Sequence, residues 1–246
     1  MTFGTLAAAP HRTKQEFVYR TLREAILRCE LQPGERLVID DLARRLDVSI
    51  IPVREALQLL QAESLVQVVP HVGTSVTPVS RDSIIDVFVV LEGLEVSATR
   101  LVTERGRPAD LALLGGQVEA MDAALAANDR EEWAALNRRF HLTISELPGL
   151  DMVKDLTAKA LDRWDRLRRF YFKGVLANRV EQAQEEHREI LEAMRGRDMT
   201  TLQTLVRRHN QGALQAYLSY LDAADPARAP ERAVAHDALR TPGSMI

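Results

Sequence analysis

The sequence predicts a mainly α-helical protein, in which an N-terminal winged helix-turn-helix is followed by an all-α antiparallel bundle of about six helices. Apolar residues recur at the helical spacing of three and four along most of the chain. Residues 66–78 instead read VQVVPHVGTSVTP, which is typical of a β-hairpin. With 246 residues, 46% of them hydrophobic, the chain can bury two cores of moderate size. We therefore expect two domains.

The first two helices of the N-terminal domain are predicted from periodicity and from the residues that end them. A helix is expected over residues 13–29, where the breaker QPGE follows it. A second helix is expected over residues 40–46, with acidic residues in its first turn as the helix dipole favours. The apolar face of the first helix is expected to carry Phe17, Leu22, Ile26 and Leu27.

A third helix and a hairpin complete this domain, which we place at residues 13–78. The helix is expected to begin at Ser49, whose side chain caps it, and to end near Ala62. Pro52 is tolerated because first-turn amides have no acceptor within the helix. The hairpin is expected to turn at residues 70–73. This order of elements is that of a winged helix-turn-helix.

The third helix has an apolar face and a polar face. The residues expected to face the core are Val53, Leu57 and Leu60. The residues expected on the opposite face are Ile50, Arg54, Gln58 and Gln61. In a helix-turn-helix, the outward residues at the start of the second helix contact base edges in the major groove. This face therefore predicts binding to double-stranded DNA.

The side chains on the polar face differ in what they can recognise. Arg54 and Gln58 have the donors needed for guanine and adenine edges, whereas Ile50 and Ile51 offer only apolar contact with thymine methyl groups or sugars. Alternatively one of the isoleucines, Ile51 rather than Ile50, packs beneath the wing. The net charge is −3, and residues 1–78 hold nine basic and nine acidic residues. DNA binding must therefore depend on local placement of side chains.

Residues 80–222 are predicted to form the helical bundle. Its helices are expected at residues 81–105, 108–127, 130–146, 151–173, 178–195 and 198–221. The first is apolar around most of its circumference, so one buried face cannot account for it. We expect it to serve the core and a subunit interface, with a homodimer as the default assembly. Outside the two domains, we expect a flexible arm over residues 1–12 and a disordered tail over residues 223–246.

Composition excludes several classes of protein. The single cysteine, Cys29, excludes an internal disulfide framework and a cysteine-rich zinc site. No apolar run is long enough to span a membrane, and the first ten residues lack the pattern of a signal peptide. We therefore expect a cytoplasmic protein without a membrane partner.

Three histidines lie on the apolar stripes of three predicted helices: His141, His187 and His209. Asn137 precedes His141 by one turn, so the two side chains share a helix face. Imidazoles from facing helices, with an oxygen donor, are a common way to build a metal site in a bundle. This set suits zinc, nickel, manganese or iron. A single inward histidine is more often a hydrogen-bonded core residue, so the alternative is a metal-free polar pocket.

The segment LREAILRCELQPGERLVIDDLARRLDVSIIPVREALQLLQAESLVQVVPHVGTSV, residues 22–76, resembles the DNA-binding domain of GntR-family transcription regulators. The matches include PGE, LA, VS, PVREAL and the wing glycine. The residues at three places differ from the family: Ile50-Ile51 replace Arg-Thr, Cys29 replaces a helix-ending glycine, and Val72 replaces the wing arginine. The fold is therefore implied, but the operator sequence is not. The expected DNA contacts are Arg44, Ser49, Ile50, Ile51, Arg54, Gln58, His71 and Gly73.

Residues 80–220 resemble, more loosely, the FCD domain of the FadR-like branch of this family, which binds effectors and forms dimers. The family's metal-site positions are occupied here by Asn137, His141, His187 and His209. The resemblance implies a divalent metal, zinc foremost. Asn137 replaces an aspartate of many relatives, so the ligands are neutral and should hold the metal less tightly. Leu91 stands where the family has an arginine suited to an effector carboxylate, which opens the pocket to apolar or larger effectors.

These features predict a transcription regulator, not an enzyme. We expect a dimer that binds a pseudo-palindromic operator, represses a metabolic operon and responds to a small, anionic effector in a metal-containing domain. One alternative is a metal-dependent hydrolase, but no carboxylate is evident as a general base beside the histidines. Another is a metal-free regulator with an apolar effector. A third alternative is a structural protein that uses the bundle only to dimerise. In that case no small molecule would change DNA binding.

Overall fold

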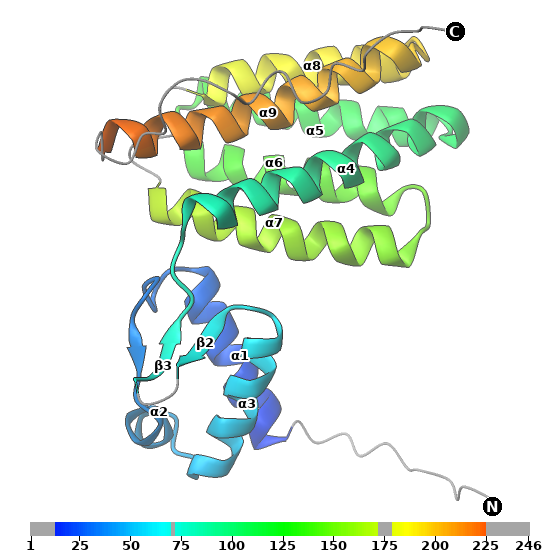
Figure 1. Cartoon of the computed structure of the whole chain (residues 1–246). Coiled ribbons are helices and arrows are strands. Elements are labelled where there is room, and N and C mark those ends of the chain that lie inside the picture. Colours follow the sequence, from blue (N-terminus) through cyan, green and yellow to red (C-terminus); the bar gives the residue numbers. More distant parts are fainter. Residues whose placement is uncertain (1–12, 70–71, 172–178, 225–246) are drawn as a thin grey trace, which may run out of the picture.

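The structure, a computed structural model, describes residues 13–69, 72–171 and 179–224, and it has two parts (Figure 1). A small N-terminal part combines short helices with a sheet, and a larger part consists of long helices packed side by side. The expected fold class, a winged helix-turn-helix followed by a helical bundle, is confirmed. The predicted arm and the tail beyond residue 224 lie outside the described residues.

The N-terminal part contains α1 (Lys14–Leu27), β1 (Arg36–Leu37), α2 (Ile39–Arg45), α3 (Ile50–Ala62), β2 (Val66–Val69) and β3 (Gly73–Val76). The strands form an antiparallel sheet in the order β1-β3-β2. The predicted hairpin is β2 and β3, with Val66 opposite Val76. The sequence does not predict β1, because two residues are too few for an alternating pattern to show. Pairing of Arg36 with Ser75 on β3 positions this strand.

The core of the N-terminal part lies between its helices and the sheet. Its members from α1 and α3 include Val18, Leu22, Ile26, Val53, Leu57 and Leu60. The predicted position of Phe17 in this core is wrong, because its side chain is 48% exposed. Val18 is buried instead, since residues 18, 22 and 26 are each four apart and form one stripe. Leu27 is half-buried at the edge of this stripe.

The residues that flank the helices show how each helix begins and ends. Cys29 has a φ angle of 57°, a left-handed conformation that favours glycine and explains the glycine in the family pattern. Ser49 occupies the N-cap position of α3, but the predicted side-chain capping hydrogen bond is not present among the described residues. Ile51 is 67% exposed, so the alternative in which it packs beneath the wing is wrong.

The helical part contains α4 (Arg81–Arg105), α5 (Pro108–Ala126), α6 (Arg130–Glu146), α7 (Asp151–Tyr171), α8 (Val180–Arg195) and α9 (Met199–Ala224). α9 packs along α4, while α5 packs against α6 and α8. Residues 223–224, expected in the tail, belong to α9. The predicted end of one helix at residues 172–173 and the predicted start of the next at residue 178 lie outside the described residues. None of the described helices is long and apolar enough to cross a membrane.

A chain of ion pairs connects the two parts. Arg23 of α1 donates to Glu63 at 2.9 Å and to Asp162 of α7 at 2.8 Å. Asp162 also accepts from Arg138 of α6 at 2.6 Å. Arg163 donates to the backbone carbonyl of Glu63 at 2.9 Å. Glu63 directly follows α3, so the end of this helix is connected through charged side chains to the helices of the bundle.

Adjacent leucines on α3 test this packing. Leu60 is fully buried, whereas Leu59 is 44% exposed. We expect Leu60→Ala to lower the free energy of unfolding of the N-terminal domain by about 2–5 kcal/mol, because a buried cavity is created. Leu59→Ala should change it by no more than about 0.5 kcal/mol. Urea unfolding followed by circular dichroism measures both. Equal losses in the two variants would contradict the orientation of α3.

Candidate functional site

A row of exposed side chains runs along the first half of α3. Ile50, Arg54 and Gln58 follow one another at intervals of four residues, so they share one face of the helix. Ile51 and Ser49 are also exposed beside the start of this row. The row presents a guanidinium fork, an amide and an apolar group, which are the groups that recognise base edges in the major groove.

The wing contains a cation that the sequence analysis missed. Arg36, on β1, is exposed, and a Cβ atom on Gly73 would lie 3.7 Å from its Nε and Nη2 atoms. Gly73 has a φ angle of 116°, which only glycine adopts readily. Arg36 thus brings a positive charge to the start of β3, beside Val72, where the family has an arginine. Arg44 is exposed on α2, and His71 lies outside the described residues.

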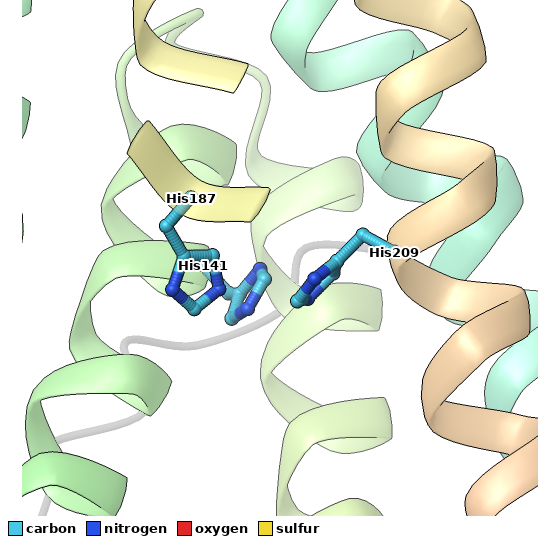
Figure 2. A group of neighbouring side chains, drawn as sticks. All are labelled: His141, His187 and His209. Atoms are coloured by element: carbon cyan, nitrogen blue, oxygen red, sulfur yellow. The ribbon is translucent and has the colours of Figure 1, made fainter. Parts of the chain in front are cut away.

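The three histidines of the bundle converge from three helices (Figure 2). His141 of α6, His187 of α8 and His209 of α9 each offer a ring nitrogen, and these nitrogens lie within 4.8 Å of one another. All three side chains are buried, as expected. Among the described residues, this is the one group of three or more histidine, cysteine or acidic residues that could hold a metal ion.

Two buried carboxylates hold the imidazole rings in place. Glu95 of α4 lies with Oε1 2.8 Å from Nδ1 of His141, and Glu186 of α8 lies with Oε2 2.8 Å from Nδ1 of His209. A carboxylate accepts a hydrogen bond from Nδ1–H, which leaves Nε2 of that ring as the ligating atom. Nδ1 of His187 lies 3.4 Å from Oε1 of Gln184. The sequence showed no carboxylate beside the histidines as a candidate general base, whereas the structure places two there, each paired with a ring nitrogen.

The protonation states suit metal binding. Burial alone would raise the pKa of Glu95, but its charge interaction and hydrogen bond with His141 outweigh burial and lower it. Burial alone would also raise the pKa of Glu186, but hydrogen bonds from His209 and Arg179 outweigh burial and lower this pKa. Burial, with the nearby histidines, lowers the pKa of His187 well below its ordinary value, and burial lowers the pKa of His209. Both rings are thus neutral near pH 7, which is the ligating form.

Two polar atoms at the cluster have no hydrogen-bond partner among the described residues. They are Nε2 of His187 and Oδ1 of Asn137, and both are buried. A buried polar atom without a partner costs free energy, so such an atom calls for a ligand. Three imidazole nitrogens and one amide oxygen fit a divalent metal such as zinc, with positions left for another ligand. The residues present therefore fit the metal that the family resemblance implies.

A cavity adjoins the histidine cluster. Its empty volume is about 570 Å³, part of it open to solvent, and Asn137, His141 and His209 line one side. The remaining wall is mainly apolar and includes Phe88, Leu91, Trp133, Leu161, Trp164 and Tyr217. Leu91 thus faces the cavity, so no arginine is available at that position to bind an effector. Arg179, at the start of α8, also lines the cavity.

Sequence reasoning missed three charged residues of this site. Glu95 could have been found, because it interrupts the buried stripe of α4 formed with Leu91 and Val102. Glu186 directly precedes His187, but it pairs with His209, which lies 23 positions later, and no pattern in the nearby sequence indicates this pairing. Arg179 lies in a turn outside any helical stripe, so periodicity cannot indicate its burial.

Comparisons with known proteins agree with these two parts. The model of the FCD domain matches residues 86–212, and that of the bacterial regulatory proteins of the gntR family matches residues 14–76. An uncharacterized HTH-type transcriptional regulator in an unstable DNA locus of Streptomyces ambofaciens is 31% identical over 233 residues, 92% of this chain and 97% of its own. The HTH-type transcriptional repressor GlaR of Escherichia coli (strain K12) is 29% identical, covering 78% of this chain and 90% of its own.

A solved structure supports the fold. E. coli McbR/YncC matches with a TM-score of 0.67 at 24% identity, covering 85% of this chain and 100% of that one. The matched relatives are transcription regulators and not enzymes. Because the FCD model alone spans more than half of the sequence, the chain belongs to the GntR family of bacterial transcription regulators and carries an FCD domain after its DNA-binding domain.

Proposed function

We propose that the protein binds a pseudo-palindromic operator as a homodimer, represses a metabolic operon and responds to a small anionic metabolite bound in its helical domain. The observation that carries this proposal is that one chain combines an exposed recognition row on α3 with a bundle in which two of the three clustered histidines, His141 and His209, line a cavity. GlaR is named a repressor, which supports repression. Selection of bound DNA from a random pool, repeated with candidate metabolites present, tests the proposal directly.

The recognition row determines how DNA would be read. In this mode α3 enters the major groove, Arg54 reads a guanine, Gln58 reads an adenine and Ile50 contacts a thymine methyl group. Arg36 at the wing supplies a phosphate contact in place of the wing arginine of the family. Two copies related by a two-fold axis would place their α3 helices on half-sites about one helical turn of DNA apart.

The exposed side of α4 supports the homodimer. Val89 and Val90 are 62% and 47% exposed, although Val87, Phe88 and Leu91 on the other side of the helix are buried. A Cβ atom on a neighbouring glycine of α4, Gly93, would meet no atom of another described element within 4 Å, so this side is open in the described part of the chain. Adjacent exposed valines on a helix that is already packed are typical of a subunit interface.

The metal would be held by Asn137, His141, His187 and His209. When bound, it supplies positive charge at its open positions, where an anionic group can coordinate. Zinc suits the histidine nitrogens best, and nickel, manganese or iron suit the same ligands. Glu95 and Glu186 orient two of the rings, so these carboxylates are occupied and not free to activate water. This arrangement favours effector binding over the hydrolase alternative.

The metal-free alternative is a regulator with an apolar effector. The aromatic cavity wall is compatible with it, because Trp133, Trp164 and Tyr217 all line the cavity. Two buried atoms favour the metal-containing form, because neither has a hydrogen-bond partner among the described residues: Nε2 of His187 and Oδ1 of Asn137. Elemental analysis of the purified, reconstituted protein separates the two forms.

Arg54 tests DNA recognition. We expect Arg54→Ala to weaken binding to the selected operator by about 1–3 kcal/mol and to relax base preference at one position per half-site, because a bidentate base contact is lost. The matched control is Arg28→Ala, an exposed arginine just after α1 that pairs with Glu24. Binding constants on operator and mutated operators measure the effect. An equal loss on every DNA sequence would assign Arg54 to the phosphate backbone instead.

His187 tests the metal site. His187→Ala should reduce the bound metal from about one ion per chain to near zero, because one of four ligands is lost from a single site per bundle. DNA binding should persist without effector, since the ligands belong to the helical domain. Elemental analysis and an operator-binding titration measure the two properties. Metal content equal to that of the unaltered protein would contradict the proposed ligand set.

Glu95 tests the role of the carboxylates. We expect Glu95→Gln to weaken metal affinity roughly 10- to 100-fold, because the acceptor that orients the ring of His141 loses its negative charge. Glu92→Gln is the matched control on the same helix, since Glu92 contacts Arg207 and Gln211 rather than a histidine. Competition with a chelator measures both affinities. If the two variants bind metal equally well, Glu95 has only a structural role.

A further inference from the structure

Arg179 is a buried cation with unused hydrogen-bond donors. Its side chain is more than nine-tenths buried, and it lines the cavity. Nη2 donates to Oε2 of Glu186 at 2.5 Å and to the backbone carbonyl of His209 at 3.3 Å. Nε and Nη1 have no hydrogen-bond partner among the described residues. Nε and Nη1 lie on different edges of the planar guanidinium, so each can donate a separate charge-assisted hydrogen bond to an oxygen of an anion.

The position of this guanidinium is set by α9. A Cβ atom on Gly212 would lie 2.8 Å from Nη2 and 3.4 Å from Cζ of Arg179. Gly212 therefore allows the guanidinium to approach the backbone of α9, and a larger residue would displace it. The contact with Glu186 restrains it from the other side. Arg179 is thus held in place before a ligand arrives, which reduces the entropy cost of binding.

With a divalent ion bound, the buried charges of the site would not balance without an anion. Glu95 and Glu186 bring two negative charges, and Arg179 brings one positive charge among the described residues that line the cavity or hold its histidines. A divalent ion on neutral histidines would bring two positive charges. The site would then carry one net positive charge in surroundings where unpaired charge is costly. One singly charged anion would neutralise it.

The cavity wall shows what the rest of the ligand must be. Beyond the polar side, the wall consists of aromatic and aliphatic side chains, including Phe88, Trp133 and Trp164. The hydroxyl of Tyr217 is buried there without a hydrogen-bond partner among the described residues. A small, highly hydroxylated acid would find only the hydroxyl of Tyr217 to pair with on this wall and would leave its other polar groups unpaired, whereas an apolar body would fill the space.

We propose that Arg179 determines effector specificity by binding the carboxylate of a monoanion with an apolar body, and that it does so in place of the arginine that the family carries at the position of Leu91. The carboxylate would accept hydrogen bonds from Arg179 on the polar side of the cavity, where a bound metal would add positive charge, and the apolar body would lie against the aromatic wall. This inference rests on the proposed effector-binding function. It names the class of effector and the residue that selects it.

The test uses the zinc-reconstituted full chain and calorimetric titration. Phenylacetate and hexanoate are the monocarboxylate probes, with aromatic and aliphatic bodies, and phenylacetamide is the neutral isostere of phenylacetate. We expect at least one carboxylate to bind and the amide to bind far more weakly. Arg179→Gln should weaken carboxylate binding roughly 10- to 100-fold, because charge-assisted hydrogen bonds are lost. Gly212→Ala should weaken it as well, because the guanidinium is displaced while its charge remains.

Arg195→Gln is the matched control, since Arg195 is an exposed arginine on the same helix that pairs with Glu192. Metal content is measured for every variant. Carboxylate binding by Arg179→Gln as tight as in the control, at equal metal content, would overturn the proposal, and so would equal binding of the acid and the amide. Failure of all carboxylates to bind would overturn the class of effector. If zinc does not bind but carboxylate binding still depends on Arg179, the metal proposal fails and this inference stands.

Discussion

The helical domain depends on a group of buried charges that cannot be left unpaired. Glu95 and Glu186 are both buried, and each accepts a hydrogen bond from a histidine of another helix. An ionised carboxylate without partners in such surroundings would cost several kcal/mol, so these pairings fix the relative positions of the helices that make them. Glu95 also accepts from Asn210 at 2.7 Å, which connects α4 to α9 in addition to α6. The same contacts that keep the bundle in register therefore orient its imidazole rings.

The cavity and the DNA-binding domain share a structural element, α7. Leu161 and Trp164 line the cavity, while Asp162 and Arg163, next to them in sequence, contact Arg23 and Glu63 of the N-terminal domain. Because consecutive residues of a helix point in different directions, one helix can have both roles. The helix that forms the wall of the cavity at Trp164 is therefore the one that contacts the end of α3. The ion pairs at this junction are partly exposed, so each contributes little to the stability of the contact between the domains.

Local patterns predicted the helices, the recognition row and the inward direction of the three histidines, because each depends on the spacing of residues within one helix. The features that were missed depend on distant partners. β1 exists because Arg36 pairs with Ser75, and the partner of Glu95 lies 46 residues later on another helix. Arg179 is buried through contacts with Glu186 and Gly212, not through the pattern of its own segment. Phe17 was misplaced because the stripe of α1 passes through the adjacent residue, Val18.

The carboxylates beside the histidines change the metal affinity that is expected with an asparagine at position 137. Taken alone, a neutral ligand set leaves a divalent ion with its full charge and predicts weak binding. In the structure, negative charge lies one hydrogen bond beyond two of the imidazole rings, on Glu95 and Glu186, and such charge makes an imidazole a stronger ligand for a metal. Asn137 then contributes an oxygen without a third negative charge in the cluster. An aspartate there would cancel the single positive charge that remains with Arg179 and a divalent ion, and with it the electrostatic reason for an anionic effector to bind.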